Sequence, residues 1–374
     1  PRVEVTMNRR YACLAPLAIL AAVSVSAQGL GFSFIGPRLN FTFGFPIPAG
    51  ADVELSLPVA PTPRGPLEAV LRLGAGYEDQ YLLRDDATGA PLSPVAAPVF
   101  QAANAQWDLG VRVPLLGGQD PRLFEAFAAW RGRYDRRFND FGTAVFEDAR
   151  GLFGNALLAG LAWNGSGADS RRVRSGLDAE WSLDWSPAGF SSVEADYLRL
   201  NAQARYFIPL FSAGSGELNR FSAYVASFAS VDWATGTDIP IHVLQSFGGR
   251  ELRSGLGGSL RGYPSKSFDA AFKAVANLEL RLLGPAMFSL PWFMPIVYGF
   301  YDAGFYDGLP ESAGREGSSG FIASAGGGFA LDIVDFAFAG FKAGVLLPGA
   351  DALFPVYAPQ GETFFFSIEF LLHF

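Results

Sequence analysis

The chain has 374 residues, half of them hydrophobic, and it is rich in glycine (44), proline (25) and phenylalanine (35). Its mean hydropathy of +0.21 is too high for a typical soluble enzyme, while so many glycines and prolines do not suit a bundle of membrane helices. The formal net charge of −8 argues against a nucleic-acid partner, whose phosphates require a basic surface. Composition therefore favours many short strands joined by turns.

The first segment, residues 1–27, has the features of an export signal. Two arginines follow Met7, an apolar run covers about residues 12–23, and small residues end at Ala27. This order is typical of a secretory signal peptide, and the apolar run is too short for the alternative, a membrane-spanning anchor. We expect cleavage near Ala27, with residues 1–6 belonging to an over-extended reading frame.

Residues 28–374 are expected to form one domain in which apolar and polar residues alternate. In the segment 174–185, even positions are mostly charged or small, whereas odd positions include leucines and tryptophans. The segment 272–282 behaves alike, with Lys273 and Glu279 on one face and leucines on the other. A period of two predicts strands with one polar and one apolar face. Fourteen strands are expected, near 31–46, 50–59, 66–83, 104–116, 122–135, 152–165, 172–186, 192–211, 219–234, 270–284, 294–307, 318–332, 333–347 and 362–374.

A soluble β-sandwich also alternates, but three features favour a transmembrane β-barrel. The chain has an export signal, aromatic residues lie at the ends of the apolar faces, and the last strand ends on a phenylalanine. Strands of about ten residues, apolar toward lipid and polar toward the lumen, describe such a barrel. Only helices and closed barrels satisfy every backbone group in lipid. We therefore expect an all-β fold, a single antiparallel barrel of 14–16 strands in the outer membrane.

The connections between the predicted strands alternate in length. Short ones such as "GSGADS" and "AGSGELN" alternate with long ones near 84–103, 136–151, 235–269 and 348–361. Short periplasmic turns and longer external loops are typical of outer-membrane barrels. The longest external loop contains the stretch "GLGGSLRGYPSKSF", residues 255–268.

Three stretches, "GGSLRGYPSKSF", "AFKAVANLELRL" and "VYGFYDAGFYDG", together resemble the C-terminal barrel of the BamA/TamA-type superfamily. That superfamily includes outer-membrane protein assembly factors, two-partner secretion transporters and related surface antigens. The resemblance implies that the long external loop folds into the barrel and carries an Arg-Gly-aromatic tip, matched by Arg261, Gly262 and Tyr263. It also implies a glutamate on the next strand and an aspartate on the one after, matched by Glu279 and Asp302.

The residues themselves give a physical reason for this arrangement. Glu279 lies on the polar face of its strand, and Asp302 would be costly in lipid, so both carboxylates are expected to point into the lumen. A planar guanidinium can bond carboxylates through two donors at once, which makes Arg261 the expected cation between them. Gly262 would let the tip turn sharply, and Tyr263 would pack on lumen side chains. The alternative is a solvated loop arginine, the usual state of an arginine in a loop.

The resemblance implies insertion of proteins into the outer membrane, or translocation across it, through a seam between the first and last strands. Family members that assemble proteins usually carry periplasmic POTRA modules before the barrel, and this chain is expected to lack them. Family barrels usually have sixteen strands, so a further hairpin within 28–46 or 84–103 is left open. The alternative function is a passive pore or structural barrel that has lost assembly activity. A third hypothesis is the barrel half of a split system.

The expected partners are outer-membrane lipid and unfolded outer-membrane or secreted proteins, with no nucleic acid. In a split system, a separate periplasmic protein would replace the missing modules. The last strand places Phe370, Leu372 and Phe374 on one apolar face, and we expect these residues to form the chain's own insertion signal.

The sequence shows no recognisable catalytic constellation. Its two histidines, His242 and His373, accompany no nucleophile motif, and neither a phosphate-binding loop nor a paired metal-ligand motif occurs. The one cysteine, Cys13, lies in the expected signal peptide, so the exported chain would have no disulfide and no cysteine-based metal site. We expect no enzymatic activity, no metal and no cofactor.

Overall fold

The computed structural model describes most of the predicted barrel and parts of its connections. Within these residues, no helix combines the length and the hydrophobicity that crossing a membrane requires. The expected signal peptide, residues 1–27, lies outside them. The described residues are 35–45, 48–81, 99–116, 123–138, 152–168, 173–191, 195–214, 220–237, 239–240, 243, 260–263, 270–289, 293–307, 319–333, 337–347 and 364–373.

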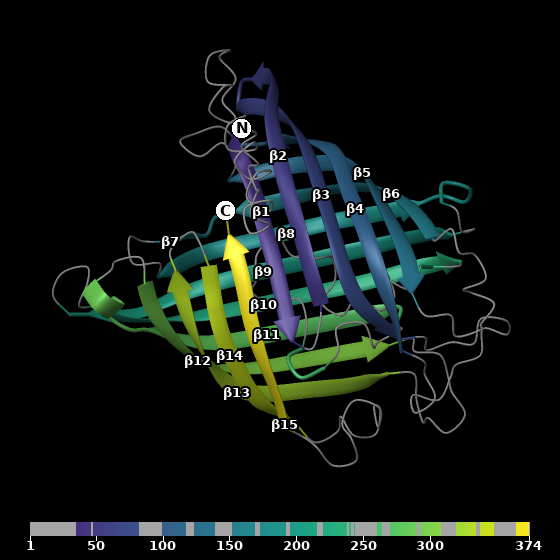
Figure 1. Cartoon of the computed structure of the whole chain (residues 1–374). Coiled ribbons are helices and arrows are strands. Elements are labelled where there is room, and N and C mark those ends of the chain that lie inside the picture. Colours follow the sequence, from purple (N-terminus) through teal and green to yellow (C-terminus); the bar gives the residue numbers. More distant parts are fainter. Residues whose placement is uncertain are drawn as a thin grey trace, which may run out of the picture.

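Fourteen long strands and the two-residue strand β7 make up nearly all of the described chain (Figure 1). A short 3-10 helix at Met287–Ser289 lies between β11 and β12. The strands are β1 (Ile35–Phe45), β2 (Pro48–Thr62), β3 (Gly65–Tyr81), β4 (Val99–Pro114), β5 (Phe124–Phe138), β6 (Leu152–Asn164), β7 (Gly167–Ala168), β8 (Arg174–Ser186), β9 (Asp196–Ala213), β10 (Phe221–Thr237), β11 (Phe272–Leu283), β12 (Phe293–Asp307), β13 (Gly320–Ile333), β14 (Ala337–Leu346) and β15 (Phe364–His373).

The strands form because their side chains alternate between an apolar outer face and a polar inner face. In β11, Leu278, Leu280 and Leu282 are exposed on the outside, whereas Lys273 and Glu279 are buried on the inside. In a membrane barrel the exposed apolar face meets lipid, and the backbone N–H and C=O groups pair between strands. The alternation therefore fixes the direction in which each site residue points.

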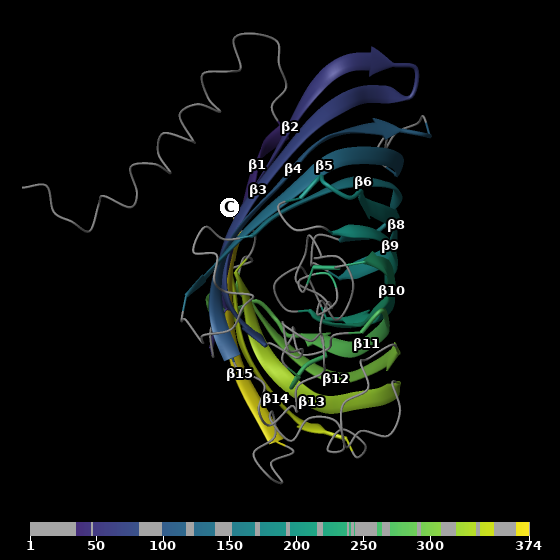
Figure 2. The same ribbon diagram turned by 90° about the vertical axis from the view of Figure 1, so that its right-hand side faces the viewer.

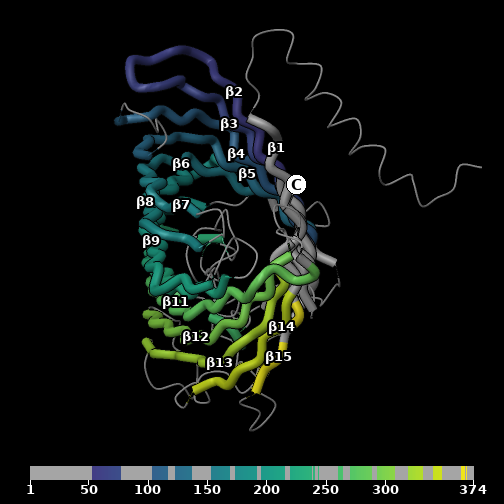
Figure 3. The backbone as a smooth tube through the Cα atoms, turned by 90° about the vertical axis from the view of Figure 1, so that its left-hand side faces the viewer, coloured from purple at the N-terminus to yellow at the C-terminus, as the bar shows by residue number. Residues whose placement is uncertain are grey.

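Each long strand pairs antiparallel with a long strand on either side. Consecutive strands are neighbours, except that β6 pairs directly with β8 while β7 pairs with the start of β8. The first and last strands also pair, with Asn40 opposite His373 and Phe45 opposite Ile368; we call this ladder the β1–β15 seam. The strands curve around an interior (Figure 2). Figure 3 follows the backbone along the same wall, from the purple N-terminal strands to the yellow C-terminal ones.

The prediction of fourteen strands is confirmed, and most boundaries lie within a few residues of those expected. The largest difference is in β4, which begins at Val99, five residues before the expected start at 104, and there pairs with Tyr81 of β3. The small residues of "QAANAQ" hide the alternation in this part of the strand. The described residues contain no additional long hairpin that would make sixteen strands, and β7 was not predicted.

Arginine–carboxylate pairs organise the polar inner face. Arg112 in β4 bonds Glu54 of β2 and Glu68 of β3, at 3.3 and 2.6 Å. Arg131 in β5 donates two parallel hydrogen bonds to Asp108 of β4, at 2.7 and 3.0 Å. A buried charge is tolerated when a partner compensates it in this way. These charges on the inner face are therefore compensated within the wall itself.

Candidate functional site

The tip of the β10–β11 loop (residues 238–271) is a tight turn. The N–H of Tyr263 donates to the carbonyl of Leu260 at 3.1 Å, which closes a four-residue turn with Arg261 second and Gly262 third. Gly262 has φ +87°, in the left-handed region that glycine adopts without steric cost. A positive φ at the third position is the signature of a type II turn. The turn therefore presents the side chain of Arg261 from a sharply bent backbone.

Arg261 bonds both carboxylates that the sequence singled out. Its Nε and Nη2 donate to Asp302 at 2.7 and 2.5 Å, and its Nη1 donates to Glu279 at 2.5 Å. Its backbone N–H also donates to Asp302, at 3.0 Å. The Asp302 side chain is 0 % exposed and that of Arg261 is 11 % exposed. Both the backbone and the side chain of Arg261 thus donate hydrogen bonds to the fully buried carboxylate of Asp302.

The two carboxylates lie on neighbouring strands, and a second arginine completes the group. Glu279 lies in β11 and Asp302 in β12, both on the inner face. Arg281 of β11 donates to the other oxygen of Glu279 at 2.6 Å and to the hydroxyl of Tyr224 in β10 at 3.2 Å. Two arginines and two carboxylates make a neutral cluster, which lowers the cost of burying four charges.

The surroundings of Arg261 keep its guanidinium charged. Burial by itself lowers the pKa of Arg261, but the hydrogen bond to Asp302 and the charges of Glu279 and Asp302 outweigh this effect and raise the pKa above its ordinary value. An arginine is protonated throughout the physiological range even without such partners. Deprotonation of Arg261 is therefore no route to releasing the tip.

The aromatic ring of Phe300 contacts the guanidinium of Arg261. The Cζ of Arg261 lies 3.9 Å from the ring centroid of Phe300, a cation–π contact. The Phe300 ring lies across Gly326 of β13, where an added Cβ would come within 2.7 Å of its Cζ. The centroid of the Phe300 ring is also 6.2 Å from that of Phe365 in β15. The absence of a side chain at Gly326 leaves room for the Phe300 ring, which in turn contacts the guanidinium of Arg261.

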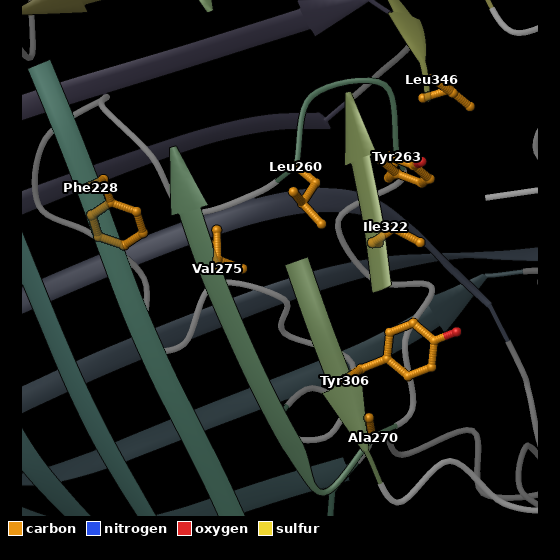
Figure 4. Close-up of a cluster of buried hydrophobic side chains, with 8 residues drawn as sticks. All are labelled: Phe228, Leu260, Tyr263, Ala270, Val275, Tyr306, Ile322 and Leu346. Carbon is orange, nitrogen blue, oxygen red and sulfur yellow. The ribbon is translucent and has the colours of Figure 1, made fainter. Parts of the chain in front are cut away.

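Apolar contacts hold the rest of the tip against the same wall (Figure 4). Leu260 and Tyr263 flank Arg261 in the turn, and both are buried. The Tyr263 hydroxyl donates to the carbonyl of Ala323 in β13 at 3.1 Å. The cluster around the tip comes from β10 to β14 and the end of the loop, and it consists of Phe228, Leu260, Tyr263, Ala270, Val275, Tyr306, Ile322 and Leu346, with Phe365 of β15 packed against it.

A second contact holds the same loop near its beginning. Val243 is buried in a cluster with Tyr197 of β9. Lys273, at the start of β11, donates to the Val243 carbonyl at 3.1 Å and lies 3.6 Å from Asp232 of β10. Its side chain is 1 % exposed, and Asp232 also accepts two hydrogen bonds from Arg199. The loop is therefore anchored twice, once at Val243 and once at its tip.

The structure brings together the five sequence-derived residues around the tip, and it adds residues that the sequence reasoning missed. Phe300 could have been found, since it shares the inner face with Asp302 two positions later. Lys273 is a lysine on the inner face next to the longest loop, which was a usable signal. Val243 carries no such signal, because its contact is made through a backbone carbonyl.

The expected insertion signal is only partly described. Phe370 and Leu372 lie in β15, opposite Phe43 and Phe41 of β1, while Phe374 lies outside the described residues. Their role in insertion stays a prediction. Among the residues that the structure describes, no group of three or more His, Cys, Asp or Glu could hold a metal ion.

Comparison with known proteins gives a clear result only at the level of structure. No family model matches the sequence, and no curated protein matches it. BamA from Haemophilus ducreyi lacking POTRA domains 1-3 is similar with a TM-score of 0.51 and 14 % identity, over 90 % of this chain and 69 % of that chain.

Two further barrels are similar to the same extent. CdiB from Acinetobacter baumannii has a TM-score of 0.52 and 10 % identity, over 90 % of this chain and 60 % of that one. CdiB from Escherichia coli has a TM-score of 0.53 and 14 % identity, over 90 % of this chain and 62 % of that one. This chain thus spans less than two thirds of the CdiB chains. At such identities the similarity concerns the fold, and we conclude that the chain has the β-barrel fold of BamA and CdiB.

Proposed function

We propose that the chain is an outer-membrane barrel that inserts proteins into the outer membrane or translocates them across it, with its loop tip docked in the lumen. The observation that carries the proposal is the contact of Arg261 with Glu279 and Asp302. It occurs at the positions that the superfamily resemblance implies, inside a sheet with the fold of BamA and CdiB. Outer-membrane localisation, with cleavage of the export signal near Ala27, is part of this proposal.

The β1–β15 seam supports a lateral opening as the step that would admit a substrate strand. Among the described residues its ladder extends from Asn40–His373 to Phe45–Ile368. Gly44 lies within this ladder, and Gly36 and Pro37 precede it in β1. Proline cannot donate to a ladder and glycine adds no packing, so both weaken strand pairing. By contrast, the β9–β10 ladder extends along the full length of both strands.

The proposal assigns no catalytic residue and no cofactor. The partners would be unfolded outer-membrane or secreted proteins, together with lipid. A separate periplasmic protein would supply the substrate capture that the superfamily assigns largely to POTRA modules.

The test uses purified protein in proteoliposomes and follows how fast an unfolded outer-membrane protein becomes protease resistant. Wild type, Arg261→Ala and empty liposomes are compared. The matched control is Arg131→Ala, which breaks another two-bond arginine–carboxylate pair on the inner face, away from the loop. We expect acceleration by wild type and by the control, and loss of acceleration in Arg261→Ala.

Two other outcomes would contradict the proposal in different ways. Equal activity of wild type and Arg261→Ala would show that insertion does not use the docked tip. No acceleration by wild type would contradict an autonomous insertase. Ion conductance through the reconstituted barrel would then identify the passive pore, and crosslinking from the short turns would search for a periplasmic partner.

A further inference from the structure

The turn between β11 and β12 differs from the other short turns on its side of the barrel. Turns such as "APTPRG" and "GSGADS" are polar, whereas this one reads "GPAMFSLPWFMP", residues 284–295. The sequence has no charged residue between Arg281 and Asp302. This turn lies at the rim opposite the β10–β11 loop, below the two strands that carry Glu279 and Asp302. It includes the 3-10 helix drawn as the short green coil at the left of Figure 1.

The backbone of this turn is strained at Phe288. This residue has φ 55° and ψ 23°, and it is the one non-glycine residue with positive φ among those that the structure describes. A bulky side chain in the left-handed region is a genuine outlier, because its Cβ crowds the backbone. Glycine would occupy the position without this cost. A phenylalanine that persists there points to a use for its ring.

The ring of Phe288 does not pack into the protein. The residue is 77 % exposed, the largest value among the exposed large hydrophobic residues described. Its ring lies near that of Phe293, with the two ring centroids 5.9 Å apart. Phe293 begins β12 on the outer face, in line with Val297, Tyr301 and Phe305. The exposed ring of Phe288 therefore extends the outward-facing row of apolar side chains of β12 beyond the first residue of the strand.

We propose that Phe288 inserts into the lipid leaflet at the rim opposite the β10–β11 loop, where it anchors the β11–β12 turn in the membrane interface. Aromatic rings gather at both interfaces of membrane barrels, where the ring meets acyl chains and the backbone meets headgroups. Continuity with this outward-facing row and the absence of charge favour lipid over a protein partner. The strained backbone aims the ring outward, toward the membrane.

The anchor would fix the position of β11 and β12 along the membrane normal, and therefore the depth of Glu279 and Asp302 in the lumen. Insertion of the ring would stabilise this position because it removes apolar surface from water. The inference rests on the transmembrane fold alone, so it can hold even where the proposed insertion activity fails.

The test places a fluorescent label in the turn and measures its contact with lipid. With Cys13 replaced by serine, Phe288→Cys carries an environment-sensitive dye, and Ala168→Cys in the polar β6–β8 turn is the matched control. A label at Met287→Cys leaves Phe288 in place, which keeps the test informative when Phe288→Cys folds poorly. Each protein is reconstituted in phosphatidylcholine vesicles with or without nitroxide-labelled lipid.

For the labels at 288 and 287 we expect blue-shifted emission, loss of fluorescence with the nitroxide lipid, and protection from aqueous iodide. The label at 168 should show the reverse. Quenching at 288 by iodide but not by the nitroxide lipid would overturn the proposal. Protection from both quenchers would overturn it as well, because the ring would then be covered by protein.

Discussion

Gly262 lies so close to Phe365 that a Cβ at this position would come within 2.5 Å of the ring. The same Cβ would lie 2.7 Å from Cδ2 of Leu346. The loop tip therefore touches the wall through bare backbone, at β14 and β15. The glycine is required twice, once for the positive φ of the turn and once for this close approach.

Gly262→Ala should release the tip. The left-handed backbone costs an alanine about 1–2 kcal/mol, and the overlap with Phe365 adds about 1–3 kcal/mol. Limited proteolysis of the β10–β11 loop should become faster, and thermal unfolding of the barrel should begin at lower temperature. Unchanged proteolysis would contradict the close approach.

Gly189→Ala is the matched control for this variant. Gly189 is the third residue of a similar turn, with φ +81° and a closing bond from the Phe190 N–H to the Pro187 carbonyl at 3.1 Å. A Cβ there meets no atom within 4 Å. The control should lose only the stability that the positive φ costs an alanine, and proteolysis of the β10–β11 loop should not change.

Removing Arg261 should destabilise the barrel mainly through the buried carboxylate of Asp302, which would be left without a compensating charge, rather than through that of Glu279. Glu279 keeps its bond to Arg281, whereas Arg261 donates the hydrogen bonds that the Asp302 carboxylate accepts in the described part of the chain. Breaking a buried pair costs about 3–5 kcal/mol, mostly through the uncompensated charge. In an Arg261→Ala background, Asp302→Asn should therefore restore part of the stability, measured by denaturant unfolding.

Glu279→Gln in the same background should not restore stability, since Arg281 would then lose its carboxylate partner and keep the neutral hydroxyl of Tyr224. Equal rescue by both substitutions would show that the two carboxylates share the charge evenly. Arg261→Lys should fall between wild type and Arg261→Ala, because an ammonium cannot present the planar fork.

The two anchors of the β10–β11 loop should act together in closing the lumen. Lys273→Met removes the charged donor to the Val243 carbonyl, and a hydrogen bond to a charged group contributes about 1.5–3 kcal/mol. Each of Lys273→Met and Arg261→Ala leaves the other anchor in place, so each alone should raise conductance little. In single-channel recordings, the double variant should raise the conductance by much more than the sum of the increases in the two single variants. Lys342→Met, which removes an inner-face lysine of β14, is the control, and purely additive conductance would argue against two anchors.

Locking the β1–β15 seam should block insertion activity. Thr42 and Leu371 are opposite each other in the ladder, and opposed Cα atoms of antiparallel strands lie within the reach of a disulfide. With Cys13 replaced, a cysteine pair at these positions should abolish activity when oxidised and restore it when reduced. The control pair, Ser227 and Leu278 in the β10–β11 ladder, should have no effect in either state. Full activity of the oxidised seam variant would exclude a lateral opening there.

The sequence was a good guide to the wall of the barrel for a physical reason. Lipid on one side and water on the other impose an alternation that a strand such as β8 cannot avoid, so Leu177, Trp181 and Trp185 lie outside as expected. The alternation weakens where residues are small, as at the start of β4, and there the prediction was least accurate.

The site was predictable only where charge was involved. Glu279 and Asp302 could be assigned to the inner face because lipid excludes them. Contacts that depend on shape, such as the Phe300 ring above Gly326 or the Val243 carbonyl at Lys273, leave no periodic trace in the sequence. Strain at Phe288 is likewise a property of the folded turn rather than of its composition.

The contacts of the loop tip have a mechanical consequence. Arg261 bonds β11 and β12, Tyr263 bonds β13, and Gly262 approaches β14 and β15. All of these strands lie on the C-terminal side of the β1–β15 seam. If the seam parts, these contacts would keep the tip with β11 to β15, on one side of the opening. Opening the seam would therefore not by itself break the contacts of Arg261, Gly262 and Tyr263, and clearing the lumen would need a second movement of the loop.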